Sequence, residues 1–261
     1  MGIVNVTPDS FFDGGKYHVP DLATEHCETL IENGADIIDI GGESSRPGSQ
    51  PVDAKEERNR VIPVIRKLCK TLQTPVSVDT TKAEVAQAAL DAGATIINDI
   101  SGFTFDENLA AIAAKYDASV VINHIQGTPA DMQQSPEYPN VTNTIKSFFQ
   151  KQIALLLNEG VSRDKIAVDP GIGFGKTLHH NFTLINQIDT FGELGNPILL
   201  GASRKSFIGK TKGLSASERL YPSLAVALVA ALKGVSILRV HDVKETWEQI
   251  QMIDELFQNK S

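Results

Sequence analysis

Acidic, amide and basic residues recur in this 261-residue chain wherever a short apolar run ends. A single such residue could be a turn former or a helix cap. The full set is better explained by one polar site, in which carboxylates and amides pair with a hydrogen-bonding ligand and cations pair with an anion. The residues at these positions are Asn5, Asp39, Asp79, Asn98, His124, Asp169, Ser203-Arg204-Lys205, Arg239 and His241.

The last two polar segments of the chain favour phosphate binding. The segments Ser203–Ser206 and Arg239–His241 place cationic or potentially cationic side chains where apolar runs end. Arg239 and His241 are two residues apart, so in a strand both point to the same face. An Arg guanidinium matches phosphate oxygens with two parallel donors. Because the whole chain carries a net charge of −8, this patch indicates a local anion site rather than a generally basic surface.

Short β-branched runs alternate with helical patterns along the chain. The predicted strands are Gly2–Val6, Asp36–Ile40, Val76–Val78, Thr95–Asn98, Ser119–Asn123, Ile166–Val168, Ile198–Gly201 and Ile237–Val240. Their nearly continuous apolar content is typical of parallel strands that are covered on both faces.

The segments between these strands have helical periodicity. The predicted helices are Asp21–Asn33, Asp53–Leu72, Thr81–Asp91, Asp106–Lys115, Val141–Asn158, His179–Ile188, Ser215–Lys233 and Val243–Gln258. Pro63 should kink the second helix or mark a break in it. Strict alternation of eight strands and eight helices predicts an α/β fold, a (β/α)8 (TIM) barrel forming a single domain over residues 1–261. A doubly wound open sheet is the alternative, but no Gly-x-Gly-x-x-Gly follows the first strand.

In such a barrel the carboxyl ends of all strands meet at one mouth, where barrel enzymes have their active sites. The Gly-, Pro- and Ser-rich loops at about residues 6–20 and 41–52 both follow strands, so we expect them to be mobile and to lie over this mouth. The loops after strands seven and eight are common phosphate sites in barrels, and the two cationic segments fall there.

Composition and charge exclude several classes of protein. A pI of about 5.3 does not suit a protein that binds nucleic acid or an anionic membrane surface. The sequence contains no run of 18 apolar residues and no signal-peptide pattern at its start, so we expect a soluble, cytoplasmic protein. Cys27 and Cys69 lie in helical patterns as small hydrophobes, which fits a reducing compartment.

Three familiar ligand-binding motifs are absent from the sequence. The segment Pro170–Thr177 is similar to a P-loop, but Pro170 stands where that motif requires its first glycine. Its glycines are better explained by close approach of the backbone to a flat ligand. The sequence has no His-Glu-x-x-His and no Cys-rich metal-binding spacing.

Taken together, the motifs resemble those of dihydropteroate synthases over the whole chain and in the family's order. Each motif alone is moderately specific, and the set is highly specific. The motifs are Met1–Phe11 with Asp13–Gly15, Ile38–Gly48, Ser77–Asp79, Ile97–Gly102, Gln126–Pro129, Asp169–Thr177, Ser203–Ser206 and Arg239–Asp242.

The resemblance implies a reaction and a set of site residues. These enzymes join 6-hydroxymethyl-7,8-dihydropterin pyrophosphate to p-aminobenzoate, releasing pyrophosphate and forming 7,8-dihydropteroate. The positions that match the family's pterin pocket are Asp79, Asn98, Asp169 and Lys205, and Asp79, Asp169 and Lys205 are the expected catalytic residues. The positions that match its pyrophosphate site are Asn5, Arg239 and His241, with Asn5 also a Mg²⁺ ligand. The positions that match its lids over p-aminobenzoate are Thr7, Phe11, Ser45, Arg46, Pro47, Phe174 and Ser206.

The implied chemistry agrees with the residue types. Loss of pyrophosphate would leave a cation on the pterin methylene, which Asp79 and Asp169 would favour electrostatically. Mg²⁺, Arg239 and His241 would neutralise the leaving group. Loops that exclude water would protect the cation until the arylamine attacks it. The family also implies a homodimer, and its partners are small molecules rather than nucleic acid or membrane.

Three other functions stay open on the sequence. A methyltransferase acting between a methyl-pterin and a corrinoid protein would share the pterin pocket but would not need Arg239, His241 and Arg46. A class I aldolase would use Lys205 to form a Schiff base. A non-catalytic pterin-binding barrel is the third, although its loops should have lost residues such as Asn5 and Arg46, which are both present.

Overall fold

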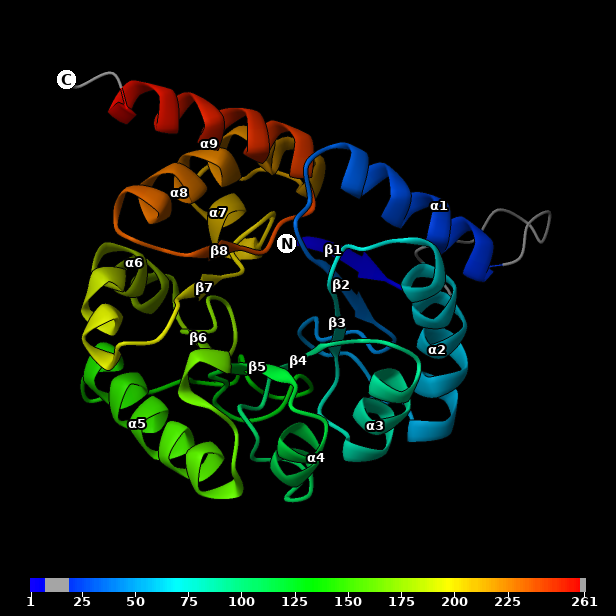
Figure 1. Cartoon of the computed structure of the whole chain (residues 1–261). Helices are drawn as coiled ribbons and strands as arrows, with labels where there is room; N and C mark the ends of the chain where they lie inside the picture. The colour runs from blue at the N-terminus through cyan, green and yellow to red at the C-terminus, as the bar shows by residue number, and fades with distance from the viewer. Residues whose placement is uncertain (8–18, 259–261) are drawn as a thin grey trace.

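A computed structural model describes residues 1–7 and 19–258 of the protein, which form a closed barrel of parallel strands inside a ring of helices (Figure 1). The strands are β1 (Gly2–Asn5), β2 (Ile38–Gly41), β3 (Val76–Asp79), β4 (Ile96–Asp99), β5 (Ser119–Asn123), β6 (Ile166–Asp169), β7 (Leu199–Leu200) and β8 (Ile237–Leu238). The predicted (β/α)8 barrel is therefore confirmed.

Two short connections close the barrel. Strands β1 to β6 form one sheet in chain order, and β7 pairs with β8. Single bridges join Val168 to Ile198 between β6 and β7, and Gly2 to Val240 between β1 and the end of β8. A hydrogen bond of 3.0 Å from Val240 N to Met1 O reinforces the second connection. Each strand thus has a neighbour on both sides.

Helices surround the barrel, and capping residues define several of their ends. They are α1 (Val19–Glu32), α2 (Ala54–Thr71), α3 (Ala83–Asp91), α4 (Leu109–Lys115), α5 (Val141–Glu159), α6 (Leu178–Asn186), α7 (Ser206–Lys210), α8 (Leu220–Leu232) and α9 (Val243–Gln258). Asp53 caps α2 by accepting a hydrogen bond of 2.8 Å from Glu56 N. Helix α5 ends at Gly160, whose φ of +101° glycine adopts without steric cost.

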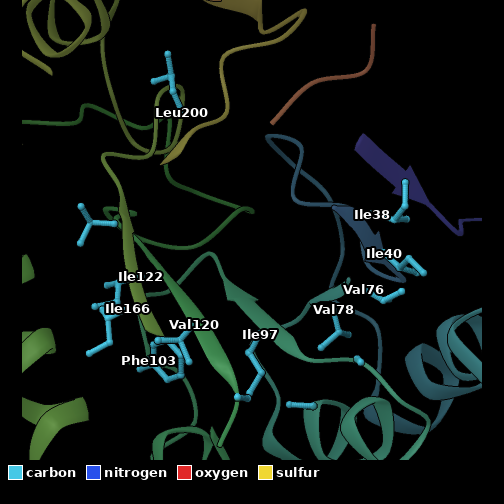
Figure 2. Close-up of a cluster of buried hydrophobic side chains, with 14 of the residues drawn as sticks. Ile38, Ile40, Val76, Val78, Ile97, Phe103, Val120, Ile122, Ile166 and Leu200 are labelled. Carbon is cyan, nitrogen blue, oxygen red and sulfur yellow. The ribbon is translucent and has the colours of Figure 1, made fainter. Parts of the chain in front are cut away.

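Alternate residues of each strand face opposite sides of the barrel wall, as the two-residue period of a strand requires. The outward-facing side chains pack against the helices and form the main core; Figure 2 labels Ile38, Ile40, Val76, Val78, Ile97, Val120, Ile122 and Ile166 among them. The residues between them face inward and form a second, smaller apolar cluster: Met1, Ile37, Ile96, Val121, Ala167, Leu199 and Ile237. Beyond this cluster, toward the carboxyl ends of the strands, the inward residues are mostly polar.

The main differences from the predicted helices concern three segments. Of the kink or break predicted at Pro63, the break does not occur, because α2 continues through this exposed residue to Thr71 and solvent can hydrate the carbonyl that the proline leaves unpaired. The predicted helix Ser215–Lys233 divides into a 3-10 turn, Ala216–Arg219, and α8. Helix α7 was not predicted, because five residues are too short to show a helical period.

Two smaller expectations concern the cysteines and membranes. Cys27 is buried and Cys69 is partly buried, and both are free thiols as predicted. Within residues 1–7 and 19–258, none of the helices has the length and apolar character needed to cross a membrane.

Candidate active site

Strand register brings polar residues from three strands, and a glycine from a fourth, to one level at the barrel mouth. Asn5 of β1 is paired with Gly41 of β2, and Gly41 is paired with Asp79 of β3. Asp79 is in turn paired with Asn98 of β4. All four positions belong to the inward-facing set, so their side chains meet inside the mouth. The predicted convergence of Asn5, Asp79 and Asn98 therefore has a direct basis in the register.

Arg239, which follows β8, connects this group to a deeper carboxylate. Its Nε donates to Asp39 Oδ2 at 2.6 Å, and one of its terminal nitrogens donates to Asp79 Oδ2 at 2.7 Å. Asn98 Nδ2 also donates to Asp39 Oδ2, at 3.1 Å. The Asp39 side chain is fully buried, and those of Asp79 and Arg239 are 14% and 16% exposed. This arrangement pairs Asp39 Oδ2 while Asp39 Oδ1 has no hydrogen-bond partner among the described residues, and it leaves Asp79 and Arg239 within reach of a ligand.

Asp169 and Lys205 complete the set of polar groups at the mouth. Asp169, at the end of β6, is buried, and its Oδ1 accepts a hydrogen bond of 2.8 Å from Gly171 N. A Cβ atom at Gly201 would lie 3.5 Å from Asp169 Oδ2 and 3.8 Å from Arg239 Cδ. Glycine at this position therefore leaves a space that the acid and the guanidinium both border.

Burial and neighbouring charges shift the pKa values of these groups. Burial raises the pKa of Asp79 to about 7, with Arg239 opposing this change and Asp39 adding to it. The pKa of Asp169 is also raised by burial, while Lys205 and the Gly171 N–H oppose the change. Burial lowers the pKa of Lys205 to about 8, against the charge of Asp169. Groups that titrate close to neutral pH inside a cleft are typical of an active site.

The loop after β6 holds Lys205 in place. The Lys205 ammonium donates to Ile172 O at 2.5 Å and lies 4.1 Å from the centre of the Phe174 ring, a cation–π contact. Gly173 allows this approach, since a Cβ there would lie 3.2 Å from Lys205 Cδ. Gly173 thus lets the backbone come close to the Lys205 side chain, whereas the predicted approach of these glycines to a flat ligand stays a prediction.

Gly171 is the tightest position in this loop, which gives the first testable prediction. Its φ is +69°, and a Cβ there would lie 1.9 Å from His124 O. We expect Gly171→Ala to destabilise the protein by about 3 kcal/mol or more, because backbone strain adds to a steric overlap that only a loop shift can relieve. Urea denaturation would measure this change.

Gly195 provides the matched control. Its φ is +72°, but a Cβ there would have no described atom within 4 Å. Gly195→Ala should therefore lose only the strain, about 1 kcal/mol. Equal effects of the two substitutions would show that the overlap at Gly171 is not present in solution.

The remaining predicted phosphate ligand, His241, lies at the rim. It is exposed, its backbone N–H donates to Ser203 Oγ at 3.2 Å, and its Nδ1 lies 3.1 Å from the same oxygen. Ser203 thus orients the His241 ring from the end of β7. His241 is in the inward-facing set with Arg239, two residues before it, as predicted.

Two residues that were expected to join the cluster lie elsewhere. His124 faces outward from the end of β5, where it is buried and its Nδ1 lies 3.1 Å from Lys176 Nζ. Arg204 has a φ of +55° and forms a two-pronged ion pair with Asp242 at 2.6 and 2.8 Å. The position of His124 follows from strand geometry, because a residue one position away from an inward-facing one points to the opposite side. Arg204 instead lies in a left-handed turn after β7, where its ion pair with Asp242 holds the side chain away from the cluster.

Among the predicted lid residues that the structure describes, Phe174 contacts the polar cluster through Lys205. Arg46, Pro47 and Ser206 are exposed, and Ser45 is partly buried. The loop that carries Arg46 is connected to the loop after β5 by a hydrogen bond of 2.9 Å from Gly48 N to Pro129 O. Of the other predicted lid residues, Thr7 is partly buried and Phe174 is buried against Lys205. Phe11 lies outside the described residues.

Sequence reasoning missed the central role of Asp39 and of two glycines. Asp39 was recognised only as one polar residue at a strand end, yet it accepts hydrogen bonds from both Arg239 and Asn98. Gly41 and Gly201 provide the free space beside the acids. The sequence held a signal for this free space, because each glycine stands at or directly after the end of a predicted strand, where neighbouring strands carry a polar residue.

The space at Gly41 fits a small hard cation. A Cβ there would lie 3.7 Å from Asp79 Oδ2 and 3.8 Å from Asn5 Oδ1. Within the described ranges, the Asn5 side chain forms no hydrogen bond, so its amide oxygen is available as a ligand. The same part of the chain has no group of three or more His, Cys, Asp or Glu residues able to hold a metal alone. One or two protein oxygens completed by water and phosphate are what Mg²⁺ ordinarily uses, so the donor set fits that ion.

A barrel with this arrangement belongs to the class of enzymes that bind a small polar ligand at the carboxyl-terminal mouth, and comparisons with known proteins define the class more closely. Residues 1–241 match the family described as pterin binding enzyme. A dihydropteroate synthase from Synechocystis is 44% identical over 258 residues, covering 98% of this chain and 89% of the relative.

Two solved structures agree with this match. A dihydropteroate synthase from Clostridium difficile, crystallised in the presence of pteroic acid, has a TM-score of 0.92 and 44% identity, covering 98% of this chain and 95% of that one. A dihydropteroate synthase from Xanthomonas albilineans in complex with 7,8-dihydropteroate has a TM-score of 0.90 and 37% identity, covering 100% of this chain and 93% of that one.

The chain belongs to the dihydropteroate synthase family of pterin-binding enzymes. These relatives support the predicted activity over the methyltransferase and non-catalytic alternatives.

Proposed function

We propose that the polar cluster at the barrel mouth performs the family's reaction in this chain. The substrates would be 6-hydroxymethyl-7,8-dihydropterin pyrophosphate and p-aminobenzoate, and the products 7,8-dihydropteroate and pyrophosphate. The observation that carries the proposal is the single cluster in which Arg239 pairs with Asp79 while Asp169 and Lys205 border the same space. Separate sites for these residues would not support any reaction on one flat ring.

The pterin ring would bind between the acids and the lysine. Its edge carries N–H donors and a carbonyl, which Asp79, Asn98 and Asp169 on one side and Lys205 on the other can pair with. The groups are pre-positioned, since Asn98 is held by Asp39 and Lys205 by Ile172 O. Little side-chain ordering would then remain to oppose binding.

The same groups would favour the bond-breaking step. Departure of pyrophosphate leaves positive charge on the pterin methylene, and Asp79 and Asp169 stabilise that charge electrostatically when ionised. The arylamine of p-aminobenzoate then attacks this carbon and loses a proton. The protein needs no nucleophile of its own, so Lys205 acts as a cationic hydrogen-bond donor to the pterin.

The pyrophosphate would bind at the ends of β1 and β8. Arg239 has donors left beyond those given to Asp39 and Asp79, and exposed His241 lies on the same side. Asn5 Oδ1 and Asp79 Oδ2 border the space at Gly41 where Mg²⁺ fits, with Asn5 as the expected ligand. Bound Mg²⁺ would neutralise the negative charge that develops on the leaving diphosphate.

The p-aminobenzoate would bind beside Phe174, under the loops at about 6–20 and 41–52. Phe174 offers an aromatic wall next to Lys205, and Ser206 begins α7 close by. Thr7, Phe11, Ser45, Arg46 and Pro47 are the lid residues that we assign from the family's motifs. Closure of both loops would exclude water, which otherwise competes with the arylamine for the cation.

The direct test of this function is an assay that measures two products. Mixing the pterin pyrophosphate, p-aminobenzoate and Mg²⁺ with the protein should release pyrophosphate and form 7,8-dihydropteroate in equal amounts. A chelator should reduce the rate by at least tenfold, and added Mg²⁺ should restore it. Pyrophosphate release that does not depend on p-aminobenzoate would mean hydrolysis instead of condensation.

The pKa values predict a bell-shaped pH dependence. Below the pKa of Asp79, about 7, this carboxyl is neutral and no longer favours the cation. Above the pKa of Lys205, about 8, the amine is neutral and is a weaker donor. We expect kcat/KM, which reports ionisations of the free enzyme, to be highest between about pH 7 and pH 8.

Asp79→Asn tests the acidic side of that profile. The residual activity of this variant should no longer rise through pH 7, while the decline above pH 8 should remain. A profile with its acidic limb unchanged would show that Asp79 does not set it.

We also propose that the protein is a cytoplasmic homodimer. Large apolar side chains are exposed on the adjacent helices α8 and α9, which pack against each other (Figure 1). They are Tyr221, Val229, Leu232, Trp247, Met252, Leu256 and Phe257. Two copies could bury this surface together. Light scattering should then give twice the chain mass of 28.2 kDa.

A further inference from the structure

Asp39 occupies an unusual position for an ionised residue, because it is fully buried beneath the proposed pterin pocket. It lies on β2 between the register partners Ile3 and Ser77 and faces into the barrel. A buried carboxylate is retained only when strong partners compensate its lost hydration. Here a single oxygen, Oδ2, accepts from Arg239 Nε at 2.6 Å and from Asn98 Nδ2 at 3.1 Å.

This contact fixes the orientation of the Asn98 amide. An ionised carboxylate only accepts hydrogen bonds, whereas an amide has a donor end and an acceptor end. The end of Asn98 that faces Asp39 must therefore be Nδ2. The reversed amide would place Asn98 Oδ1 against Asp39 Oδ2, which loses a buried hydrogen bond and adds repulsion between two oxygens. Asn98 is 4% exposed, so water cannot readily replace the lost bond.

The same oxygen also orients Arg239. With Nε directed to Asp39 and a terminal nitrogen directed to Asp79, the guanidinium has one defined rotation. The neighbouring Ser77 does not take part, because its hydroxyl is buried and forms no hydrogen bond with any described residue. Asp39 alone therefore links the orientation of Asn98 to that of Arg239.

We propose that Asp39 is a positioning residue that fixes the donor–acceptor polarity of the Asn98 amide. Through Asn98, Asp39 selects which pattern of hydrogen-bonding groups a ring must carry to bind in the pocket. This inference rests on the proposed function, since it requires Asn98 to contact the pterin. Asp39 itself does not touch the ligand. Its effect is on specificity, because a pocket with one fixed amide polarity rejects a ring whose donors and acceptors are exchanged.

The experiment compares two isomeric ligands. Pterin and isopterin have the same shape, but their amino and oxo groups are exchanged. Calorimetry would give both dissociation constants for the wild type, Asp39→Ala, Asp39→Asn and Asn98→Ala. Ser77→Ala is the matched control, since Ser77 is the adjacent inward residue and forms no hydrogen bond with any described residue.

The preference for pterin over isopterin is the decisive quantity. We expect Asp39→Ala to reduce this preference by about tenfold or more, because Asn98 can then turn to suit either ring. Asp39→Asn keeps an oxygen acceptor toward Asn98 and should retain most of the preference despite losing the charge. Ser77→Ala should leave it unchanged. If Asp39→Ala does not fold, Asp39→Ser replaces it, because a hydroxyl both donates and accepts and cannot impose one polarity.

The outcomes separate this inference from the proposed function. If Asn98→Ala keeps the wild-type preference, Asn98 does not contact the ring, and the pterin site and the inference fail together. If Asn98→Ala loses the preference but Asp39→Ala keeps it, the site stands and the inference is wrong. Equal weakening of both ligands in Asp39→Ala, with the ratio preserved, would show that Asp39 has only a structural role.

Discussion

Lys205→Ala should fold normally and lose at least about 10²-fold in kcat/KM, the scale observed when one pre-positioned electrostatic group is removed. The ammonium of Lys205 is held by Ile172 O and the Phe174 ring and faces Asp169 across the mouth. Removing it takes away the only cation that we place against the pterin edge. Stability should change little, because burial lowers the pKa of this lysine and so disfavours its charge.

The control for this variant lies five residues further along. Lys210 ends α7 and is exposed, so Lys210→Ala should retain wild-type kcat/KM. Asp79→Ala should resemble Lys205→Ala, since it removes the opposing charge of the same pocket. Near-wild-type turnover in both Lys205→Ala and Asp79→Ala, with intact thermal unfolding, would argue against this active site.

Arg239→Ala should produce the largest combined effect on stability and ligand binding. It leaves the carboxylates of Asp39 and Asp79 without their cation, and breaking a buried pair in this way typically destabilises a protein by about 3–5 kcal/mol. Pyrophosphate affinity should also fall by about tenfold or more, because a charged donor to the diphosphate is lost. Urea denaturation and calorimetry measure the two effects separately.

The stability effect of Arg239→Ala should depend on pH. Without the guanidinium, the pKa of Asp79 in the folded protein rises further above its unfolded value, because Arg239 is the group that lowers it. A raised carboxyl pKa means that the unfolded state ionises first, so stability falls as pH rises until the folded carboxyl also ionises. This fall ends near pH 7 in the wild type and continues in the variant, which should therefore lose stability relative to wild type as pH increases above about 7. The exposed Arg66 on α2 provides a control that should show neither effect. Unchanged pyrophosphate binding in Arg239→Ala would contradict the assignment of the phosphate site.

The barrel could be predicted from sequence because its strands and helices alternate strongly. For example, the strand predicted at Ser119–Asn123 has the same first and last residues as the observed strand β5. Strands β7 and β8 were each predicted two residues too long, β7 by one residue at each end and β8 by two at its carboxyl end, where the chain leaves the sheet to form the active-site rim. Such departures depend on tertiary contacts, among them the Arg204–Asp242 pair, which no local pattern encodes.

The site was predictable only in part, for a related reason. Polar residues at strand ends indicated Asn5, Asp79, Asn98, Asp169 and Arg239, and strand register brings them or their neighbours together. The direction in which each side chain points was harder to predict from the sequence. His124 was placed in the cluster although it lies one residue from an inward-facing position, and a one-residue offset reverses the face. Arg204 was placed there too, although it lies in a left-handed turn after β7.

The role of Asp39 could not be inferred because it depends on three strands at once. Its partners, Asn98 and Arg239, are 59 and 200 residues away in the chain. Only the closed barrel brings these residues into contact. Phe11 and most of the first loop lie outside residues 1–7 and 19–258.

A crystal structure of the protein with the dihydropterin pyrophosphate and Mg²⁺ tests the central claim most directly. The ring should lie between Asp79, Asn98, Asp169 and Lys205, and the diphosphate should contact Arg239 and His241, with Mg²⁺ bound by Asn5 in the space beside Gly41. A pterin bound away from Asp79 and Lys205, or a diphosphate bound at a different end of the barrel, would contradict it.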